Sequence, residues 1–138
     1  MSSRTNFDAS KLPNNLPEVA KMTAQLVALK STDPGSYEEE IETFIKAWIV
    51  DSCSFSLPNK KEMFPIIQEV EVFPHRRCLR ATIPSTTTSF ESSTLPPSDL
   101  TFICHMDTVT DGDGWNSETP AFNPVYKDGL LYGRGSCD

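Results

Sequence analysis

A short apolar run that ends in polar residues places the strongest constraint on how this chain can fold. Leu100-Thr101-Phe102-Ile103-Cys104 is followed at once by His105-Met106-Asp107. A strand that is apolar on both faces is typical of the buried centre of an α/β sheet. In open sheets of that kind, ligands bind at the carboxyl ends of the strands. The run therefore predicts a central strand over residues 100–104, with His105 and Asp107 at a ligand-binding edge.

The first half of the chain carries the periodicity of two helices. We expect the first to start at a cap formed by Asn15 and Glu18 and to end at Asp33-Pro34-Gly35. Ser36 and Glu39 repeat the capping spacing for the second helix. In both, apolar residues recur at steps of three and four, which is typical of a face packed in the core. These positions are Val19, Met22, Leu26 and Leu29 in the first helix, and Tyr37, Ile41, Phe44, Ile45, Trp48 and Ile49 in the second.

Two further segments carry the patterns of β-hairpins. Residues 66–73 and 77–83 predict two strands joined by a turn at Pro74-His75-Arg76, where His75 is expected to be an exposed structural histidine. Lys127-Asp128-Gly129-Leu130 predicts a tight turn between two short strands. Helices combined with such strands indicate an α/β fold, in which helices pack on a mixed β-sheet.

Composition excludes several classes of partner and compartment. The net charge of −7 argues against nucleic acid as a partner. No apolar run is long enough to span a membrane, and the first residues lack the apolar segment of a secretory signal. The four cysteines have no C-x-x-C spacing, which favours reduced thiols and a cytoplasmic location. We expect residues 1–14 to form a flexible arm, and the Ser/Thr/Pro-rich residues 84–98 to form a flexible loop within one domain.

Two stretches supply candidate metal ligands. If the central strand continues to residue 107, His105 and Asp107 point to the same side. A metal-binding histidine commonly donates its other ring N–H to a carboxylate, so His105 would bind the metal and Asp107 would orient it. A purely structural His–Asp pair is the alternative reading of these two residues. Gly133-Arg134-Gly135-Ser136-Cys137-Asp138 then forms a glycine-rich turn that ends in a carboxylate able to bridge two cations.

The order of these motifs resembles the dinuclear zinc aminoacylase and carboxypeptidase family. The resemblance covers about residues 100–138 and rests on HMDTV, an acidic turn with Trp, a Pro-x-Phe segment, an Asp-Gly hairpin and YGRGSCD. The family includes acetylornithine deacetylases, succinyl-diaminopimelate desuccinylases, aminoacylases and related dipeptidases. This sequence departs from the family pattern at Cys104, where a glycine often stands, and at Thr110, where a proline often stands. Both positions flank the site, so the departures remove no ligand but leave the substrate undefined.

The resemblance implies a role for each candidate residue. His105 matches the first metal-binding histidine, Asp107 the supporting carboxylate at the active site, and Asp138 the carboxylate that bridges two metals. It also implies two Zn²⁺ ions per complete site, with Co²⁺ as a possible substitute, and hydrolysis of an amide bond in an N-acyl amino acid or peptide. The implied architecture is the N-terminal part of a zinc-peptidase-like three-layer α/β/α catalytic domain over residues 15–138. The full-length form is expected to be a homodimer.

Two hypotheses about function remain open from the sequence. In the family, the general-base Glu and the remaining metal ligands lie after the position that matches Asp138. The glutamates before this position, such as Glu38, Glu39, Glu40 and Glu69, are expected on solvated faces. The first hypothesis is that this chain is the N-terminal portion of a longer metal-dependent hydrolase and is inactive alone. The second is a truncated, non-catalytic domain that binds metal weakly or pairs with another chain.

Overall fold

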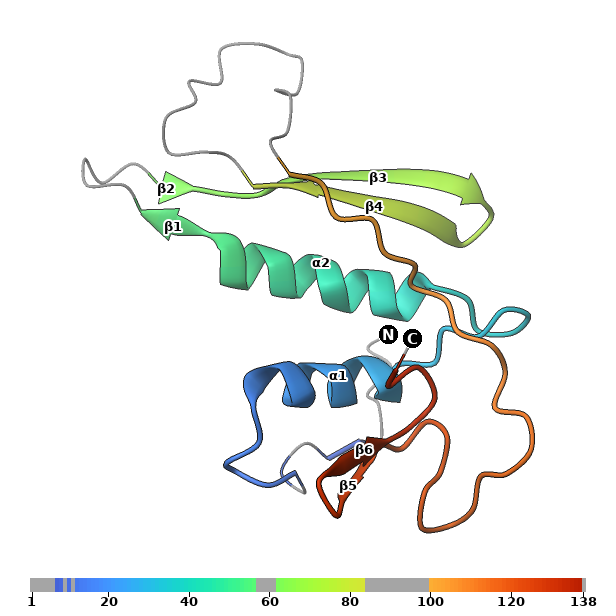
Figure 1. Cartoon of the computed structure of the whole chain (residues 1–138). Coiled ribbons are helices and arrows are strands. Elements are labelled where there is room, and N and C mark those ends of the chain that lie inside the picture. Colours follow the sequence, from blue (N-terminus) through green and yellow to red (C-terminus); the bar gives the residue numbers. More distant parts are fainter. Residues whose placement is uncertain (1–6, 9, 11, 57–61, 84–99, 138) are drawn as a thin grey trace. The chain divides into compact units, whose positions relative to one another are not determined.

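The computed structural model describes residues 7–8, 10, 12–56, 62–83 and 100–137 (Figure 1). Within these residues it contains two α-helices and three two-stranded antiparallel sheets. This mixed architecture confirms the predicted α/β class, whereas the three-layer arrangement stays a prediction. The expected loop 84–98, Asp138 and much of the expected arm 1–14 lie outside the described residues. Neither helix in this part of the chain is long and apolar enough to cross a membrane.

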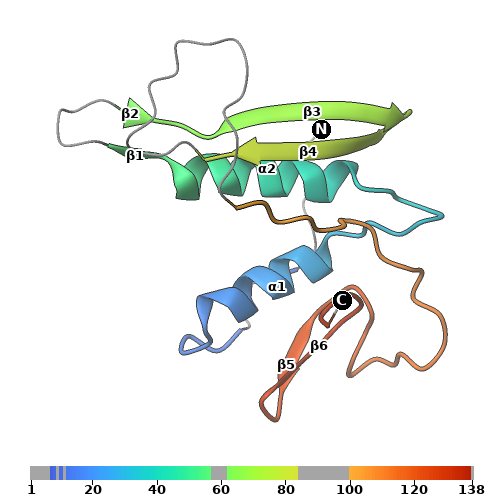
Figure 2. The ribbon, with the colours of Figure 1, turned by 45° about the horizontal axis from the view of Figure 1, so that its top comes forward.

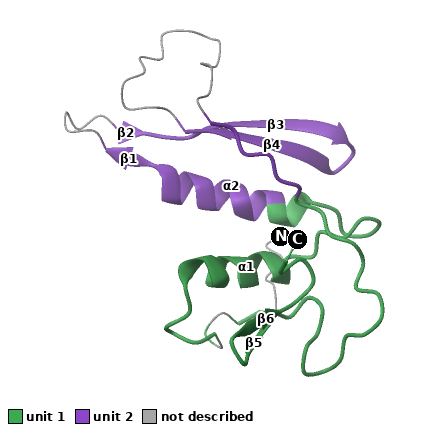
Figure 3. Ribbon diagram, viewed as in Figure 1, with its two compact units in different colours: residues 1–41, 106–138 green, residues 42–105 purple. Residues whose placement is uncertain are grey.

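The chain divides into two compact units, shown in different colours in Figure 3. Unit 1 comprises Met1–Ile41 and Met106–Asp138, and unit 2 comprises Glu42–His105. The second helix, α2 (Glu39–Cys53), therefore begins in unit 1 and continues in unit 2. His105 is the last residue of unit 2, and Asp107 belongs to unit 1.

Unit 1 is built on helix α1 (Glu18–Ala28) and the hairpin of β5 (Val125–Lys127) and β6 (Leu130–Tyr132). The hairpin lies beside α1 in both ribbon views (Figures 1 and 2). The core of this unit consists of Leu12, Leu16 and Ala24, with Phe7, Ala20, Tyr126 and Leu131 packed against it. Burial of each large apolar side chain contributes about 1.5–3 kcal/mol, so these contacts hold the hairpin to the helix.

Helix α1 starts later than the sequence predicted. The carbonyl oxygen of Pro17 accepts hydrogen bonds from the N–H groups of Ala20 at 2.9 Å and Lys21 at 3.1 Å, so Pro17 is the N-cap. The predicted cap at Asn15 is wrong. A cap there would make Leu16 the first helical residue, and the residue before a proline is disfavoured in helical conformation. The predicted apolar face is also wrong at Val19, which is 74% exposed. Ala24 and Val27 are the buried residues of the helix instead.

The turn of the β5–β6 hairpin confirms the prediction made from its Asp-Gly pair. Asp128 has φ of 54° and Gly129 has φ of 81°. Positive φ at both central residues is the signature of a type I′ turn, whose twist matches that of the paired strands. The register pairs Val125 with Tyr132 and Lys127 with Leu130. Local turn chemistry is thus sufficient to specify this hairpin.

Unit 2 contains most of α2, a short pair of β1 (Phe55–Ser56) and β2 (Glu62–Met63), and a longer hairpin of β3 (Ile66–Phe73) and β4 (Arg76–Thr82). The longer hairpin runs alongside α2 (Figures 1 and 2). It confirms the strands predicted over residues 66–73 and 77–83, apart from small shifts at their ends. A bulge interrupts the register between Glu71 and Phe73, and the turn residue His75 is exposed, as predicted.

The predicted cap of the second helix is wrong. Ser36 lies in the turn before α2, where its hydroxyl donates a hydrogen bond to the carbonyl oxygen of Lys30 at 3.0 Å. Tyr37 has φ of 57° and is therefore not helical, so the helix begins only at Glu39. Of its expected apolar face, Ile41 is buried, whereas Trp48 is 45% exposed.

The predicted central strand is absent from the structure. Residues 100–104 are extended but unassigned to any strand, and they are exposed. Phe102 is 82% and Ile103 is 93% exposed. A central strand needs partners on both sides to satisfy its backbone, and among the described residues no strand pairs with this segment. The prediction of a buried strand at residues 100–104 is therefore wrong for this chain.

Candidate metal centre

The segment that carries Asp107 is anchored directly after that residue. Thr108 forms an isolated parallel bridge with Thr32. The N–H of Thr108 donates to the carbonyl oxygen of Ser31 at 2.9 Å, and the carbonyl oxygen of Thr108 accepts from the N–H of Asp33 at 3.0 Å. These two bonds fix the backbone that follows Asp107, which is itself half-buried.

His105 occupies a different environment from Asp107. The side chain of His105 is exposed and lies at the end of the extended segment 100–105 of unit 2. Because the expected strand is not formed there, its period of two does not place the imidazole and the carboxylate on a common face. The role of Asp107 as the support of His105 therefore stays a prediction.

A compact polar arrangement fastens the acidic turn after Asp107 to the glycine-rich turn near the end of the chain. The carbonyl oxygen of Asp111 accepts two hydrogen bonds, from Trp115 Nε1 at 2.6 Å and from Arg134 Nη2 at 2.6 Å. The guanidinium carbon of Arg134 also lies 5.3 Å from the centre of the Trp115 ring. A cation over an indole face is attracted by the ring. The side chain of Arg134 therefore contacts the acidic turn at two places, the carbonyl oxygen of Asp111 and the ring of Trp115. We call these three residues the Arg134 clasp.

The Arg134 clasp should make a measurable contribution to unit 1. In a Trp48→Phe background, which leaves Trp115 as the only tryptophan, we expect Arg134→Ala to shift the emission of Trp115. We also expect it to lower the free energy of unfolding by about 1–2 kcal/mol, because one charge-assisted hydrogen bond and one cation–π contact are lost. Arg134→Lys keeps the charge but lacks the planar fork, so it should recover only part of the loss. Unchanged emission and unchanged unfolding for Arg134→Ala would contradict this role.

The turn that leads towards Asp138 is packed tightly against helix α1. Gly133 is buried, and a Cβ atom added at this position would overlap Val27 Cγ1. The N–H of Arg134 donates to the carbonyl oxygen of Ala121 at 2.7 Å, and the N–H of Ser136 donates to that of Gly133 at 3.2 Å. The glycine at 133 is thus required by close packing, which agrees with the structural role expected for this turn. Asp138 itself lies outside the described residues.

The described residues do not form a complete metal site. Among them, no three His, Cys, Asp or Glu side chains come together in an arrangement that could hold a metal ion. The imidazole of His105 and the carboxylate of Asp107 are suitable donor types for zinc, but stable zinc sites use three or four protein ligands. The donor set in the described part of the chain therefore fits zinc in kind and not in number.

The burial of the glutamates agrees only in part with the sequence prediction. Glu38 was expected on a solvated face, but it is 7% exposed, and so the prediction is wrong there. Glu39 and Glu40 are exposed, as expected. Glu42, which the sequence did not single out, is 1% exposed. All four cysteines are free thiols, which agrees with the expected absence of a disulfide framework.

Comparison with known proteins finds similarity to hydrolases. The chain is 31% identical over 129 residues to an uncharacterized metallohydrolase of Methanococcus maripaludis, an alignment that covers 89% of this chain and 28% of that protein. It is also 49% identical over 39 residues to a succinyl-diaminopimelate desuccinylase of Nitratiruptor, which covers 28% of this chain and 10% of that enzyme. The chain thus spans less than a third of the length of these relatives. No protein-family model matches the chain. No solved structure matches it.

Proposed function

We propose that this chain is the N-terminal portion of a metal-dependent hydrolase that cleaves an amide bond in an N-acyl amino acid or a peptide. The observation that carries the proposal is the 31% identity to a metallohydrolase over 129 residues, which includes nearly the whole chain. The second similarity, to a desuccinylase, agrees with an amide-cleaving reaction. The motif order over residues 100–138 supports the same class from the residues themselves.

In this proposal, three side chains serve the metal centre. His105 and Asp138 are metal ligands, and Asp107 accepts the second ring N–H of His105 so that the imidazole keeps the tautomer and orientation that binding requires. The metal, proposed as zinc with cobalt as a substitute, supplies an acidified water and polarises the carbonyl when it is bound. The Thr32–Thr108 bridge holds the backbone next to Asp107, and the Arg134 clasp holds the glycine-rich turn that precedes Asp138 in the sequence. The general base and the remaining ligands are proposed to lie in the rest of the longer protein.

The experiment that tests the proposal is hydrolysis by the product of the complete reading frame. The protein is stripped with a chelator, supplied with Zn²⁺ or Co²⁺, and assayed on N-acetyl amino acids, N-succinyl amino acids and dipeptides. We expect hydrolysis of at least one class, which disappears with the chelator and returns with the metal, because the metal supplies the nucleophile. Hydrolysis that persists without metal contradicts the mechanism. A reading frame that stops after residue 138, with no activity, favours the non-catalytic alternative.

A further inference from the structure

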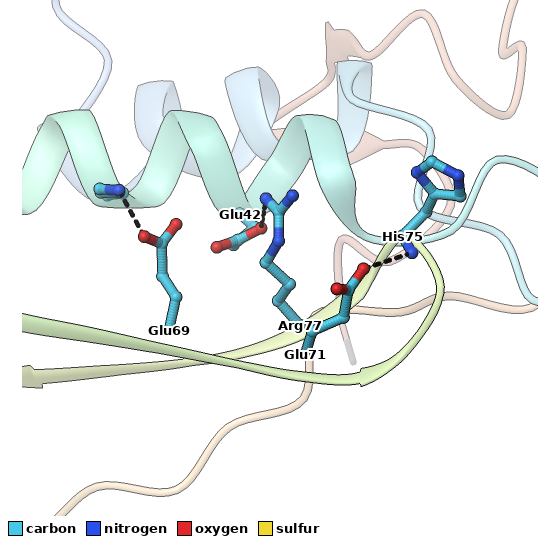
Figure 4. Close-up of polar contacts among 6 residues, drawn as sticks. Glu42, Glu69, Glu71, His75 and Arg77 are labelled. Atoms are coloured by element: carbon cyan, nitrogen blue, oxygen red, sulfur yellow. Dashed lines mark hydrogen bonds and ion pairs between the residues drawn. The ribbon is translucent and has the colours of Figure 1, made fainter.

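The interface between α2 and the β3–β4 hairpin in unit 2 is rich in charged side chains. Lys46 Nζ on the helix lies 2.7 Å from Glu69 Oε2 on β3. Glu42 Oε2, one turn earlier on the helix, lies 3.4 Å from Arg77 Nη1 on β4 (Figure 4). Neighbouring positions of the helix thus contact both strands of the hairpin through ionisable groups.

Glu42 is the unusual member of this group. Its side chain is 2% exposed, whereas that of Glu69 is 33% exposed. Glu42 Oε1 is buried and has no hydrogen-bond partner among the described residues, and Oε2 has only a long contact to Arg77. A buried carboxylate with one unpartnered oxygen is costly, whereas a neutral carboxylic acid in the same place costs much less. Geometry therefore favours the protonated form of Glu42.

The surroundings of Glu42 and Glu69 shift the pKa values of these two carboxyl groups in opposite directions. Burial raises the pKa of Glu42, and the neighbouring charge of Glu69 raises it further, while Arg77 opposes both effects. The hydrogen bond from Lys46 lowers the pKa of Glu69, and the charge of Arg77 adds to this effect. The pKa values of the two neighbouring carboxyl groups are therefore shifted in opposite directions. Glu42 can then keep its proton at a pH at which Glu69 is ionised.

We propose that Glu42 is protonated in the folded chain beside an ionised Glu69, and that loss of this proton at higher pH loosens the contact between α2 and the β3–β4 hairpin, which makes Glu42 a pH-sensitive latch. Among the described residues, Lys46 from the helix and Arg77 from β4 form ion pairs with these two carboxyl groups. Glu71, on the same hairpin, is engaged by the backbone N–H of His75 at 3.0 Å. This latch involves none of the candidate metal ligands and does not depend on the proposed hydrolase function.

The direction of the pH dependence follows from the two shifts. Glu42, with its raised pKa, adds stability that is complete below its unfolded pKa and is lost as pH rises through its folded pKa. Glu69, with its lowered pKa, adds stability that is present above its unfolded pKa and is lost as pH falls through its folded pKa. The latch is therefore strongest between these two titrations and weakens on the alkaline side when Glu42 loses its proton.

Urea unfolding of the full chain at two pH values tests the proposal. Glu42→Gln keeps the shape of the neutral acid and removes the charge, so its urea midpoint at about pH 8 should equal or exceed that of the wild type. Between about pH 5 and about pH 8, the wild-type midpoint should fall more than that of Glu42→Gln. The matched control is Glu40→Gln, which makes the same change at an exposed position of α2 and should retain the wild-type profile.

Three results would overturn the latch. If Glu42→Gln lowers the midpoint at about pH 8, an ion pair of ionised Glu42 with Arg77 is the dominant bond. If wild-type and Glu42→Gln profiles are parallel, Glu42 does not titrate in the folded range. Carbon-13 NMR of the Glu carboxyl groups gives an independent readout: one resonance should titrate above all other glutamates, and it should vanish in Glu42→Gln. A spectrum in which all glutamates titrate together contradicts the proposal even if a variant unfolds.

Discussion

Replacing His105 by alanine in the full-length protein is expected to reduce metal-dependent hydrolysis by at least about 100-fold. Loss of a group that only supports a ligand typically costs about 10–100-fold in metal affinity or activity, and His105 is proposed as a ligand itself. Asp107→Ala should fall within that smaller range, because it leaves the imidazole in place but removes its orienting carboxylate. The measurement is the hydrolysis rate at saturating and at limiting metal concentration, so that a loss of metal affinity is separated from a loss of chemistry.

The chain supplies a matched control for this prediction, because it contains only one other histidine. His75 is exposed at the β3–β4 turn and has φ of 64°. His75→Asn removes an imidazole while keeping a residue that tolerates this backbone conformation. It should leave hydrolysis and its metal dependence unchanged. Equal activity of the His105→Ala and His75→Asn proteins would show that the metal-ligand assignment is wrong.

Substituting Gly133 by alanine is expected to lower the free energy of unfolding by about 1–3 kcal/mol, the usual cost of forcing an extra group into a packed interior. The added methyl would overlap Val27, which is 5% exposed and belongs to the buried face of α1. A branched, buried side chain has little room to move aside, so the helix and the glycine-rich turn must separate. Chemical denaturation of the wild-type and variant chains measures the loss.

A second substitution separates this clash from a general effect on the turn. Val27→Ala removes the atom that the new methyl would meet. In the double variant, the cost of Gly133→Ala should therefore be smaller than in the wild type, with a coupling of about 1 kcal/mol. Strictly additive effects of the two substitutions would contradict the proposed contact between α1 and the turn.

The features that the sequence predicted correctly depend on local chemistry. The β5–β6 hairpin follows from Asp128-Gly129, which adopt the positive φ values that a type I′ turn needs. The β3–β4 hairpin follows from the alternation of residues 66–73 and from the turn after it. The two helices were also predicted, since their apolar periodicity extends over several turns. Both helices begin later than their predicted caps.

The features that the sequence did not predict depend on distant neighbours. Residues 100–104 have the composition of a central strand, but strand burial requires partners, and none pairs with them in the described residues. The burial of Glu42 arises from the hairpin packed on α2, which a helical charge pattern does not reveal. The contact between Trp115 and Arg134 likewise joins two turns that are well separated in the chain, and no local motif signals it.

The candidate site shows the same division between local and distant information. Asp107 is followed by a firmly bonded residue, Thr108, but nothing in the motif itself predicts its bridge to Thr32. The resemblance assigned His105 and Asp138 as ligands from motif order, which carries information on chemistry and none on their separation in space. The position of these residues relative to one another therefore stays a prediction.

The metal content of the purified full-length protein tests the central claim most directly. Elemental analysis after dialysis against Zn²⁺ should find about two ions per chain in the wild type, as expected for a dinuclear hydrolytic site. It should find fewer ions in His105→Ala, with His75→Asn retaining the wild-type content. A wild-type protein that holds no divalent metal, or a His105→Ala protein that holds the full complement with unchanged affinity, would contradict the claim that this chain contributes to a metal centre.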